Sequence, residues 1–365
     1  MTHPHPSLGL RTSELPTPSL LIDLDAFEAN CRSIGSHLAA KSVGWRPHVK
    51  AHKSPRLARS MIEAGAMGVT CAKVSEAEIM VAGGIQNILV ANQPATGDAW
   101  DRVARLQRVT WVGVAIDDVE HARYAVDAGR RMDVDIPLLI EVDIGMDRAG
   151  VKTPQAAVTL AAAIVDIGAE FAGVMGYEGH LLTVWPVEEK RSVIRRAVGL
   201  IAAAAEAIRH ASIPVAIVSC GGSGSYEISS DVDGVTEIQA GGGCLMDRFY
   251  REMCHVDLEQ ALFLVASVGS RPSAGRAILD AGWKALPDKL IRPACRDFTQ
   301  AEVAQLYAEH ARLEWTGDAD PGIGERIVLV PGYSDATTVL HGEFLGMRDG
   351  VVVEVIPLAA RGALQ

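Results

Sequence analysis

The sequence predicts an eight-stranded α/β barrel followed by a second domain rich in β-strands. Short apolar runs with many β-branched residues recur eight times between residues 44 and 240, and alanine-rich amphipathic segments separate them. From about residue 251 the helical segments stop, and short alternating strands broken by Gly and Pro continue. A chain of 365 residues has room for a barrel of about 250 residues and one further domain.

The eight barrel strands are expected at regular intervals along the chain. They are residues 44–51, 68–73, 87–92, 110–116, 136–144, 171–179, 214–221 and 235–240. Continuous apolar runs such as residues 138–142 suit parallel strands that are covered on both faces. Helices expected at residues 54–64, 75–82 and 193–210 would supply right-handed crossovers. A doubly wound open sheet is the competing layout.

The second domain is expected to be built from short strands without regular helices between them. These strands are predicted at residues 262–270, 276–280, 326–330 and 350–357. We expect the barrel to occupy residues 21–250, and the β domain to comprise residues 1–20 and 251–365. The Pro-rich start of the chain would then pack on the β domain.

Composition and charge exclude several classes of function. The net charge is −11 and no stripe of Lys and Arg is present, so binding to nucleic acid is not expected. No signal peptide and no apolar run of about 18 residues is seen, which predicts a cytoplasmic protein without a membrane span. The six cysteines lack CxxC spacing, so we interpret them, Cys220 and Cys244 included, as reduced and buried for packing.

Residues able to carry chemistry gather at the ends of the predicted strands, where barrel enzymes place their active sites. Lys50 ends the first strand between His48 and His52, and glycine-rich loops follow strands seven and eight. Because backbone N–H groups in such loops can approach a phosphate closely, these loops predict a phosphate site. A phosphate pocket together with a barrel lysine indicates pyridoxal phosphate, whose aldehyde attaches to an amine.

Lys50 is preferred to Lys53 as the reactive amine. Strand alternation would place His48, Lys50 and His52 on one face and Lys53 on the other. The alternatives are a structural ion pair for Lys50 and metal ligation by the two histidines, although histidines beside a cofactor more often serve as hydrogen-bond partners.

Two further charged groups have a structural alternative. A strand-end arginine is costly to bury without an anionic partner, which favours a site role for Arg148 over pairing with Asp143 or Asp147. Asp280 and Lys284 could have a role in the site or could form a salt bridge within a turn, and the sequence does not decide between the two.

Four segments together resemble the D-threonine aldolase/D-serine dehydratase family, which belongs to the alanine racemase-like class (fold type III) of pyridoxal phosphate enzymes. They are Thr17–Asp25, Pro47–Lys53, Gly145–Gly150 and Asp280–Lys284. The resemblance covers nearly the whole chain and implies an N-terminal barrel, a C-terminal β domain and a homodimer.

The resemblance also implies roles for individual residues. Lys50 would carry the cofactor through a Schiff base, Arg148 would contact its phenolic oxygen, and Tyr177 would lie near its ring. The loop at residues 221–225 and the loop at residues 241–243 would hold the phosphate. The full set of cofactor-binding candidates is Lys50, Arg148, Tyr177, Ser219, Gly221, Gly222, Ser223, Gly224, Gln239, Gly241, Gly242 and Gly243.

The chain departs from the family at its metal-binding loop. Metal-dependent members place a histidine there, followed two residues later by an aspartate or cysteine, and this chain has Tyr333 and Asp335 at those positions. A phenol is a poor ligand near neutral pH because its proton leaves only near pH 10. A divalent metal is therefore doubtful, with Asp335 as its one candidate ligand unless His341 or His180 joins it.

The expected function is a lyase of the aldolase type that cleaves a D-β-hydroxy-α-amino acid to glycine and an aldehyde. Its catalytic candidates are Lys50, His48, His52 and Tyr333, where Tyr333 or a neighbouring histidine handles the β-hydroxyl proton. Retro-aldol cleavage needs only a base and an electron sink, whereas dehydration needs help for the departing hydroxyl.

Three alternatives stay open. They are a racemase or epimerase with Tyr333 as its second base, a dehydratase acting on D-serine or D-3-hydroxyaspartate, and a non-catalytic pyridoxal phosphate carrier. A carrier would not need the second domain. The expected partner is a small amino acid, which serves as the substrate.

Overall fold

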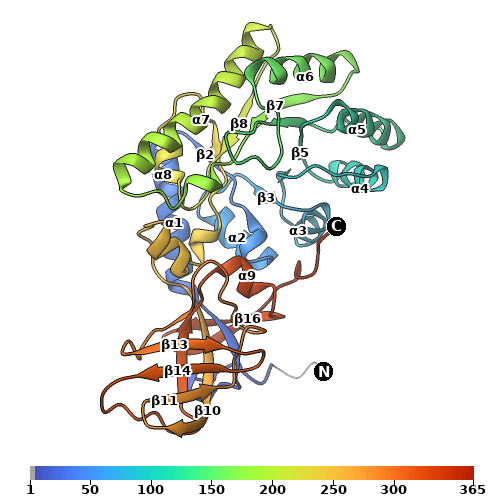
Figure 1. Cartoon of the computed structure of the whole chain (residues 1–365). Coiled ribbons are helices and arrows are strands. Elements are labelled where there is room, and N and C mark those ends of the chain that lie inside the picture. The colour runs from blue at the N-terminus through green and yellow to red at the C-terminus, as the bar shows by residue number, and fades with distance from the viewer. Residues whose placement is uncertain (1–4) are drawn as a thin grey trace. The chain divides into compact units, whose positions relative to one another are not determined.

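The computed structural model describes residues 5–365, which form two compact units. The barrel unit comprises residues 32–50, 57–241 and 362–365, and the β unit comprises residues 5–31, 51–56 and 242–361. Figure 1 labels helices and strands of both units. No helix within residues 5–365 combines the length and the apolar character that crossing a membrane would need.

The barrel unit is built on one sheet of eight parallel strands, which confirms the predicted fold class. Its order is β2-β9-β8-β7-β6-β5-β4-β3. Thr70 N–H donates to the Pro47 carbonyl (2.9 Å) and Met67 N–H to the Trp45 carbonyl (2.8 Å), so the two edges of the curled sheet meet. The open-sheet alternative is therefore wrong. The strands are β2 (Gly44–Trp45), β3 (Val69–Cys71), β4 (Ile88–Val90), β5 (Val112–Ile116), β6 (Leu138–Glu141), β7 (Phe171–Met175), β8 (Ile217–Cys220) and β9 (Glu237–Ile238).

Helices alternate with these strands along the chain, as Figure 1 shows. In α6 the Thr153 hydroxyl caps the first turn by accepting from Ala156 N–H, and Pro154 occupies a position where no helical N–H is needed. Its buried residues Ala157, Leu160, Ala161 and Ile164 repeat at helical spacing, which gives the helix one apolar face. The helices are α1 (Leu24–Ala40), α2 (Pro55–Glu63), α3 (Val74–Ala82), α4 (Gly97–Gln107), α5 (Val119–Met132), α6 (Pro154–Asp166), α7 (Val187–His210) and α8 (Tyr226–Ser229).

The first predicted strand is much shorter in the structure. β2 ends at Trp45, and Val49–Ala51 form a 3-10 helix, η2. A 3-10 turn repeats every three residues, so the alternation that placed His48, Lys50 and His52 on one face is wrong. The choice of Lys50 over Lys53 must therefore be made on contacts.

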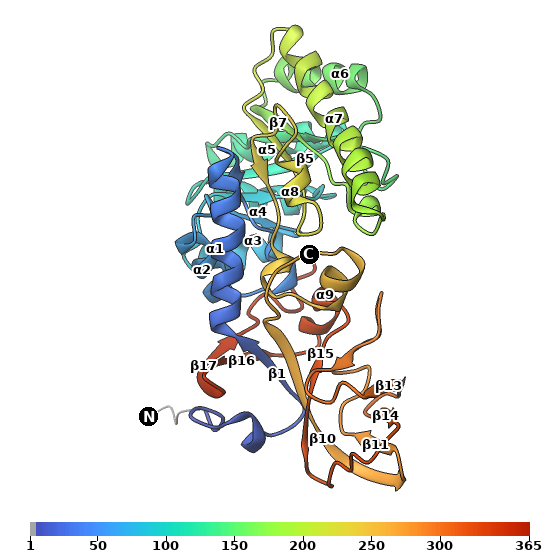
Figure 2. The ribbon, with the colours of Figure 1, turned by 90° about the vertical axis from the view of Figure 1, so that its left-hand side faces the viewer.

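The β unit contains a nine-stranded, mainly antiparallel sheet. Its strands are β1 (Ser19–Asp23), β10 (Leu262–Ser273), β11 (Arg276–Leu279), β12 (Ala294–Cys295), β13 (Ala301–Leu306), β14 (Ala311–Trp315), β15 (Arg326–Val330), β16 (Glu343–Arg348) and β17 (Val351–Pro357). Figure 2 shows β1 beside β10, with Leu21 opposite Phe263 in an antiparallel pair. On its other side β1 runs parallel to β16.

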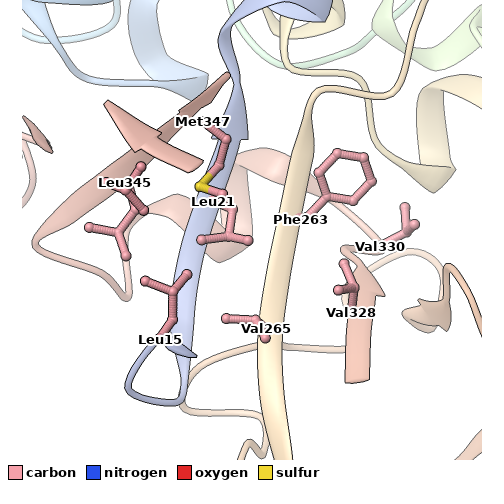
Figure 3. Close-up of a cluster of buried hydrophobic side chains, with 9 residues drawn as sticks. Leu15, Leu21, Phe263, Val265, Val328, Val330, Leu345 and Met347 are labelled. Atoms are coloured by element: carbon pink, nitrogen blue, oxygen red, sulfur yellow. The ribbon is translucent and has the colours of Figure 1, made fainter. Parts of the chain in front are cut away.

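The core of the β unit collects side chains from strands that lie far apart in the sequence. Leu21 of β1, Phe263 and Val265 of β10 and Leu345 of β16 point into one apolar cluster, to which Leu15 also belongs (Figure 3). Burying one such side chain stabilises the fold by about 1.5–3 kcal/mol. The shorter elements of the chain are η1 (Thr12–Glu14), η3 (Gly179–Leu181), η4 (Gly242–Cys244), the π-helix η5 (Phe249–Met253) and α9 (Ser334–Thr338).

The cysteines are as predicted. None of the six forms a disulfide within residues 5–365, and all six are buried. Burial raises the pKa of the Cys220 thiol well above its ordinary value, and the nearby charges of Glu178 and Glu237 add to this effect. These thiols therefore act as packing groups.

Candidate active site

Lys50 presents its amine at the carboxyl end of the barrel strands. It lies on η2, its side chain is half-buried, and its Nζ is 5.9 Å from the centroid of the Tyr177 ring. Its backbone N–H donates to His48 Nδ1 at 3.3 Å, which orients the imidazole of His48. The predicted residues Lys50, His48 and Tyr177 thus belong to one neighbourhood in the barrel unit.

The loop after β8 packs closely against Tyr177. A Cβ atom on Gly222 would lie 2.9 Å from the Tyr177 ring, so no larger residue fits there without a shift. Gly221 has a φ of +80°, which side chains other than that of glycine rarely adopt. Both glycines are therefore required by the geometry of this loop.

The loop after β9 is equally close to the lysine segment. A Cβ atom on Gly241 would lie 2.2 Å from the His48 carbonyl oxygen. Only a glycine lets the two backbones approach in this way. The glycine-rich loops after strands seven and eight therefore flank the segment that carries Lys50.

Some backbone N–H groups of the buried residues in these loops make no hydrogen bond within residues 5–365. Gly222 N–H donates to Ser225 Oγ (3.0 Å) and Gly221 N–H to Glu178 Oε2 (3.3 Å). Within residues 5–365, by contrast, the N–H groups of Gly224 and Gly241 have no acceptor. Buried N–H groups are nearly always paired, so these two fit a bound anion such as the phosphate of pyridoxal phosphate.

Ser219 and Gln239 form a buried pair at the ends of β8 and β9. Gln239 Nε2 donates to Ser219 Oγ at 2.9 Å. Both residues are buried, and the hydrogen bond holds the two strand ends in register. The structure thus brings together these two predicted residues.

Arg148 pairs with a carboxylate that the sequence interpretation did not name. Its guanidinium donates to Glu141 Oε1 at 3.1 Å, and Gln93 donates to the other oxygen of Glu141. Glu141 is buried, whereas about half of the Arg148 side chain is exposed. The alternative considered for Arg148, pairing with Asp143 or Asp147, is not the one formed, because its partner is Glu141.

His52 lies in the β unit and is fully buried. Its Nδ1 accepts from Ser54 N–H at 3.1 Å, so the neutral ring carries its proton on Nε2. Among the described residues no acceptor is found for that Nε2–H. Burial, assisted by the charge of Lys53, lowers the pKa of His52 to about 3. His52 is therefore a neutral hydrogen-bond donor at physiological pH.

Tyr333 belongs to an aromatic cluster in the β unit. Its ring packs edge-on against Phe249 (5.4 Å between centroids) and lies 6.5 Å from the ring of Tyr250. A Cβ atom on Gly242 would lie 2.8 Å from Tyr250 Oη, so this phenol reaches the glycine loop that contains Gly242 and Gly243.

Asp247 fixes the loop that carries Tyr333. One of its oxygens accepts from Tyr250 N–H (2.9 Å) and the other from Ser334 N–H (2.6 Å). Burial raises the pKa of Asp247 to about 7, and the charge of Asp335 adds to the shift. Asp247 thereby connects the two segments that form the cluster.

The donor set around Asp335 does not fit a divalent metal. No group of three or more His, Cys, Asp or Glu side chains placed to hold a metal occurs in residues 5–365. His341 is engaged elsewhere in the β unit, because its Nε2 lies 2.7 Å from the Ala285 carbonyl oxygen. His180 is an exposed residue of the barrel unit whose ring lies against Gly145.

The turn salt bridge considered for Asp280 and Lys284 is not formed. Asp280 accepts from Thr17 Oγ1 (2.5 Å) and from Ser267 N–H (2.7 Å), while Lys284 pairs with Glu309. Asp280 thus joins the N-terminal segment to β10, which is a structural role.

Glu178, Glu141, Tyr250 and Asp247 were missed by sequence reasoning. A carboxylate at the end of an apolar strand was the available signal for the two glutamates, since such a group needs partners when buried. Tyr250 and Asp247 follow a glycine loop but carry no periodic pattern.

Comparison with known proteins agrees with this geometry. The profile of the alanine racemase N-terminal domain matches residues 22–248, and that of a putative serine dehydratase domain matches residues 261–347. The chain belongs to the D-threonine aldolase/D-serine dehydratase family. The predicted family membership is therefore confirmed.

Several members of the family are similar over nearly the full length. A D-threonine aldolase from Arthrobacter sp is 34% identical, covering 96% of this chain and 94% of that protein. A 3-hydroxy-D-aspartate aldolase from Paracoccus denitrificans (strain Pd 1222) is 32% identical, covering 97% and 94%. The crystal structure of D-threonine aldolase from Filomicrobium marinum superposes with a TM-score of 0.93 at 34% identity, covering 98% and 99% of the two chains.

Proposed function

We propose that this protein is a pyridoxal phosphate-dependent aldolase that cleaves a D-β-hydroxy-α-amino acid to glycine and an aldehyde. Two of the similar proteins are named as aldolases of this type. The observation that carries the proposal is the half-buried amine of Lys50 beside Tyr177, flanked by loops whose Gly224 and Gly241 N–H groups lack acceptors.

Different residues of the barrel unit would hold different parts of the cofactor. Lys50 provides the amine for covalent attachment, and the N–H groups of Gly224 and Gly241 receive the phosphate. Arg148, oriented by Glu141, offers a positive charge to an oxygen of the ring. When bound, pyridoxal phosphate supplies an electron sink for the negative charge left at Cα after the Cα–Cβ bond breaks.

A base must remove the β-hydroxyl proton so that the C–O group becomes the aldehyde carbonyl. We assign this role to Tyr333 of the β unit or to a histidine, for which His180 and His48 at strand ends of the barrel unit are the candidates. His52 is less suited to it, because burial keeps its ring neutral with the proton on Nε2 and its Nδ1 occupied. General base catalysis of this kind contributes about 10²–10⁴-fold.

The test is a product assay with the purified, cofactor-loaded protein in the presence of a chelator. D-threonine and D-3-hydroxyaspartate would be supplied, and glycine and the matching aldehyde would be quantified. Release of both products in equal amounts is expected. If no D-β-hydroxy amino acid yields glycine, the proposed function is wrong.

A dehydratase is the second candidate, because the C-terminal part of the chain matches a putative serine dehydratase domain. Dehydration would yield ammonia and a 2-oxo acid with all carbons retained. The same assay distinguishes the two reactions, since only the aldolase produces glycine. Dehydration needs a metal or a strong acid at the departing hydroxyl. This chain has Tyr333 at the position where metal-dependent members of the family have a histidine, and this difference disfavours dehydration.

A further inference from the structure

We propose that Glu178 is a positioning residue that holds the phosphate-binding loop and thereby sets the preference for phosphorylated over unphosphorylated pyridoxal. This inference rests on the proposed function, in which the loop at residues 221–225 receives the phosphate. Glu178 is fully buried and directly follows Tyr177 at the end of β7.

Each carboxylate oxygen of Glu178 accepts a hydrogen bond from a different side of the loop. Oε2 accepts from the N–H of Gly221, which opens the loop, at 3.3 Å. Oε1 accepts from the hydroxyl of Ser229, which lies in α8 directly after the loop. One side chain therefore bonds to the residue before segment 222–225 and to the last residue of the short helix that follows it.

Tyr177 and Glu178 hold the loop from two directions. The Tyr177 ring packs against Gly222, where an added Cβ would lie within 2.9 Å of it. The next residue, Glu178, anchors Gly221, whose left-handed backbone turns the chain into the loop. The direction of the Gly224 N–H depends on these anchors, because the loop lies between them.

The burial of this carboxylate argues for a positioning role. No salt bridge to Glu178 is formed within residues 5–365, so its charge is stabilised by the two hydrogen bonds without a cation. A buried carboxylate costs several kcal/mol relative to an apolar residue of the same size. What it provides here is two acceptors in a fixed geometry, which neither an apolar residue nor an amide supplies.

The experiment compares two ligands on the full-length protein after removal of the cofactor. Dissociation constants for pyridoxal 5′-phosphate and for pyridoxal would be measured by titration for the wild type, Glu178→Gln and Ser229→Ala. For Glu178→Gln the affinity for the phosphorylated ligand is expected to fall about 10- to 100-fold. The amide has only one acceptor oxygen, so its NH2 group would face a donor at one of the two anchors. The affinity for pyridoxal should change less than about twofold.

Glu141→Gln is the matched control. It removes another buried carboxylate of the same barrel, but one that holds Arg148 and not the loop. It should weaken both ligands by a similar factor. Ser229→Ala removes one of the two anchors and should show a smaller loss for the phosphorylated ligand alone, which keeps the test valid if Glu178→Gln unfolds.

The outcomes separate this inference from the proposed function. Equal losses for both ligands in the Glu178 and Ser229 variants, or no loss for either, would overturn the positioning role. A wild-type protein that does not bind the phosphorylated ligand more tightly than pyridoxal would instead overturn the cofactor assignment itself.

Discussion

The strand ends of the barrel unit and the Tyr333 loop of the β unit hold their functional groups in different ways. In the barrel unit, close approach at glycines is prominent: a Cβ on Gly241 would clash with the His48 backbone, and a Cβ on Gly222 with the Tyr177 ring. In the β unit, side chains dominate, because Tyr333 is placed by the rings of Phe249 and Tyr250 and by the two hydrogen bonds of Asp247. Glycines held by such close approach tolerate few substitutions, whereas a cluster held by side chains can accept a change in one member more readily.

The largest effect should come from the barrel unit. Lys50→Ala is expected to abolish covalent cofactor attachment and to lower kcat by roughly 10³-fold or more, because it removes the amine proposed to form the Schiff base. Borohydride reduction followed by peptide mapping measures the attachment site. Lys284→Ala, which removes an exposed lysine paired with Glu309, should leave the adduct unchanged. An adduct on Lys53 would overturn the assignment of Lys50.

A smaller effect is expected from the β unit. Tyr333→Phe should lower kcat by about 10²-fold while the cofactor stays attached to Lys50, because it removes one proton-transfer group. Steady-state kinetics together with the visible absorbance of the bound cofactor would check this. An unchanged kcat would assign the β-hydroxyl proton to a histidine instead.

The reverse exchange sharpens the comparison. Tyr333→His would place a nitrogen ligand two residues before Asp335, as in the metal-dependent members of the family. The variant is expected to bind a divalent ion and to become sensitive to chelators. Metal content would be measured by elemental analysis against the wild type. A variant that stays metal-free would show that this loop has lost more than one ligand.

The smallest effect concerns the pH dependence of stability at His52. Its folded-state pKa of about 3 lies below the ordinary value of 6.5, so the neutral form is favoured by folding. This contribution is complete above pH 6.5 and is lost as the pH falls toward 3, at no more than about 1.4 kcal/mol per pH unit. Between pH 7 and pH 5 the wild type should therefore lose about 2 kcal/mol relative to His52→Asn in urea unfolding.

Asp247 has the opposite sign and explains why the variant comparison is needed. Burial raises its pKa from 3.8 to about 7, so its contribution is complete below pH 3.8 and is lost as the pH rises toward 7. The wild-type profile alone mixes the two groups. Equal pH profiles for the wild type and His52→Asn would show that His52 titrates normally.

The same contrast explains what the sequence could predict. The eight barrel strands were found because each is an apolar run bounded by helical segments, as at Leu138–Glu141. The 3-10 turn at Val49–Ala51 was missed because Val49, Lys50 and Ala51 alternate between apolar and charged residues, as a strand does. β1 was missed because it is short and its pairing partner is distant. Leu21 pairs with Phe263, more than two hundred residues away, and the local sequence does not predict such a pair.

The site follows the same rule. Lys50, Tyr177 and the glycine loops were found because they stand at strand ends with distinctive residue types. The links from Glu178 to Gly221 and from Glu141 to Arg148 join side chains that only the folded sheet brings together. Tyr333 was noticed through the family resemblance, because nothing in its local sequence predicts its aromatic neighbours.

The path of the chain between the two units has a practical consequence. The polypeptide passes from one unit to the other after Cys31, Lys50, Arg56, Gly241 and Arg361. No single protease nick or truncation point can release either half intact, and swapping halves between relatives would need matched splices at all five places. Lys50 is the last barrel-unit residue before one of these junctions, so a splice at that place would have to preserve the backbone around it.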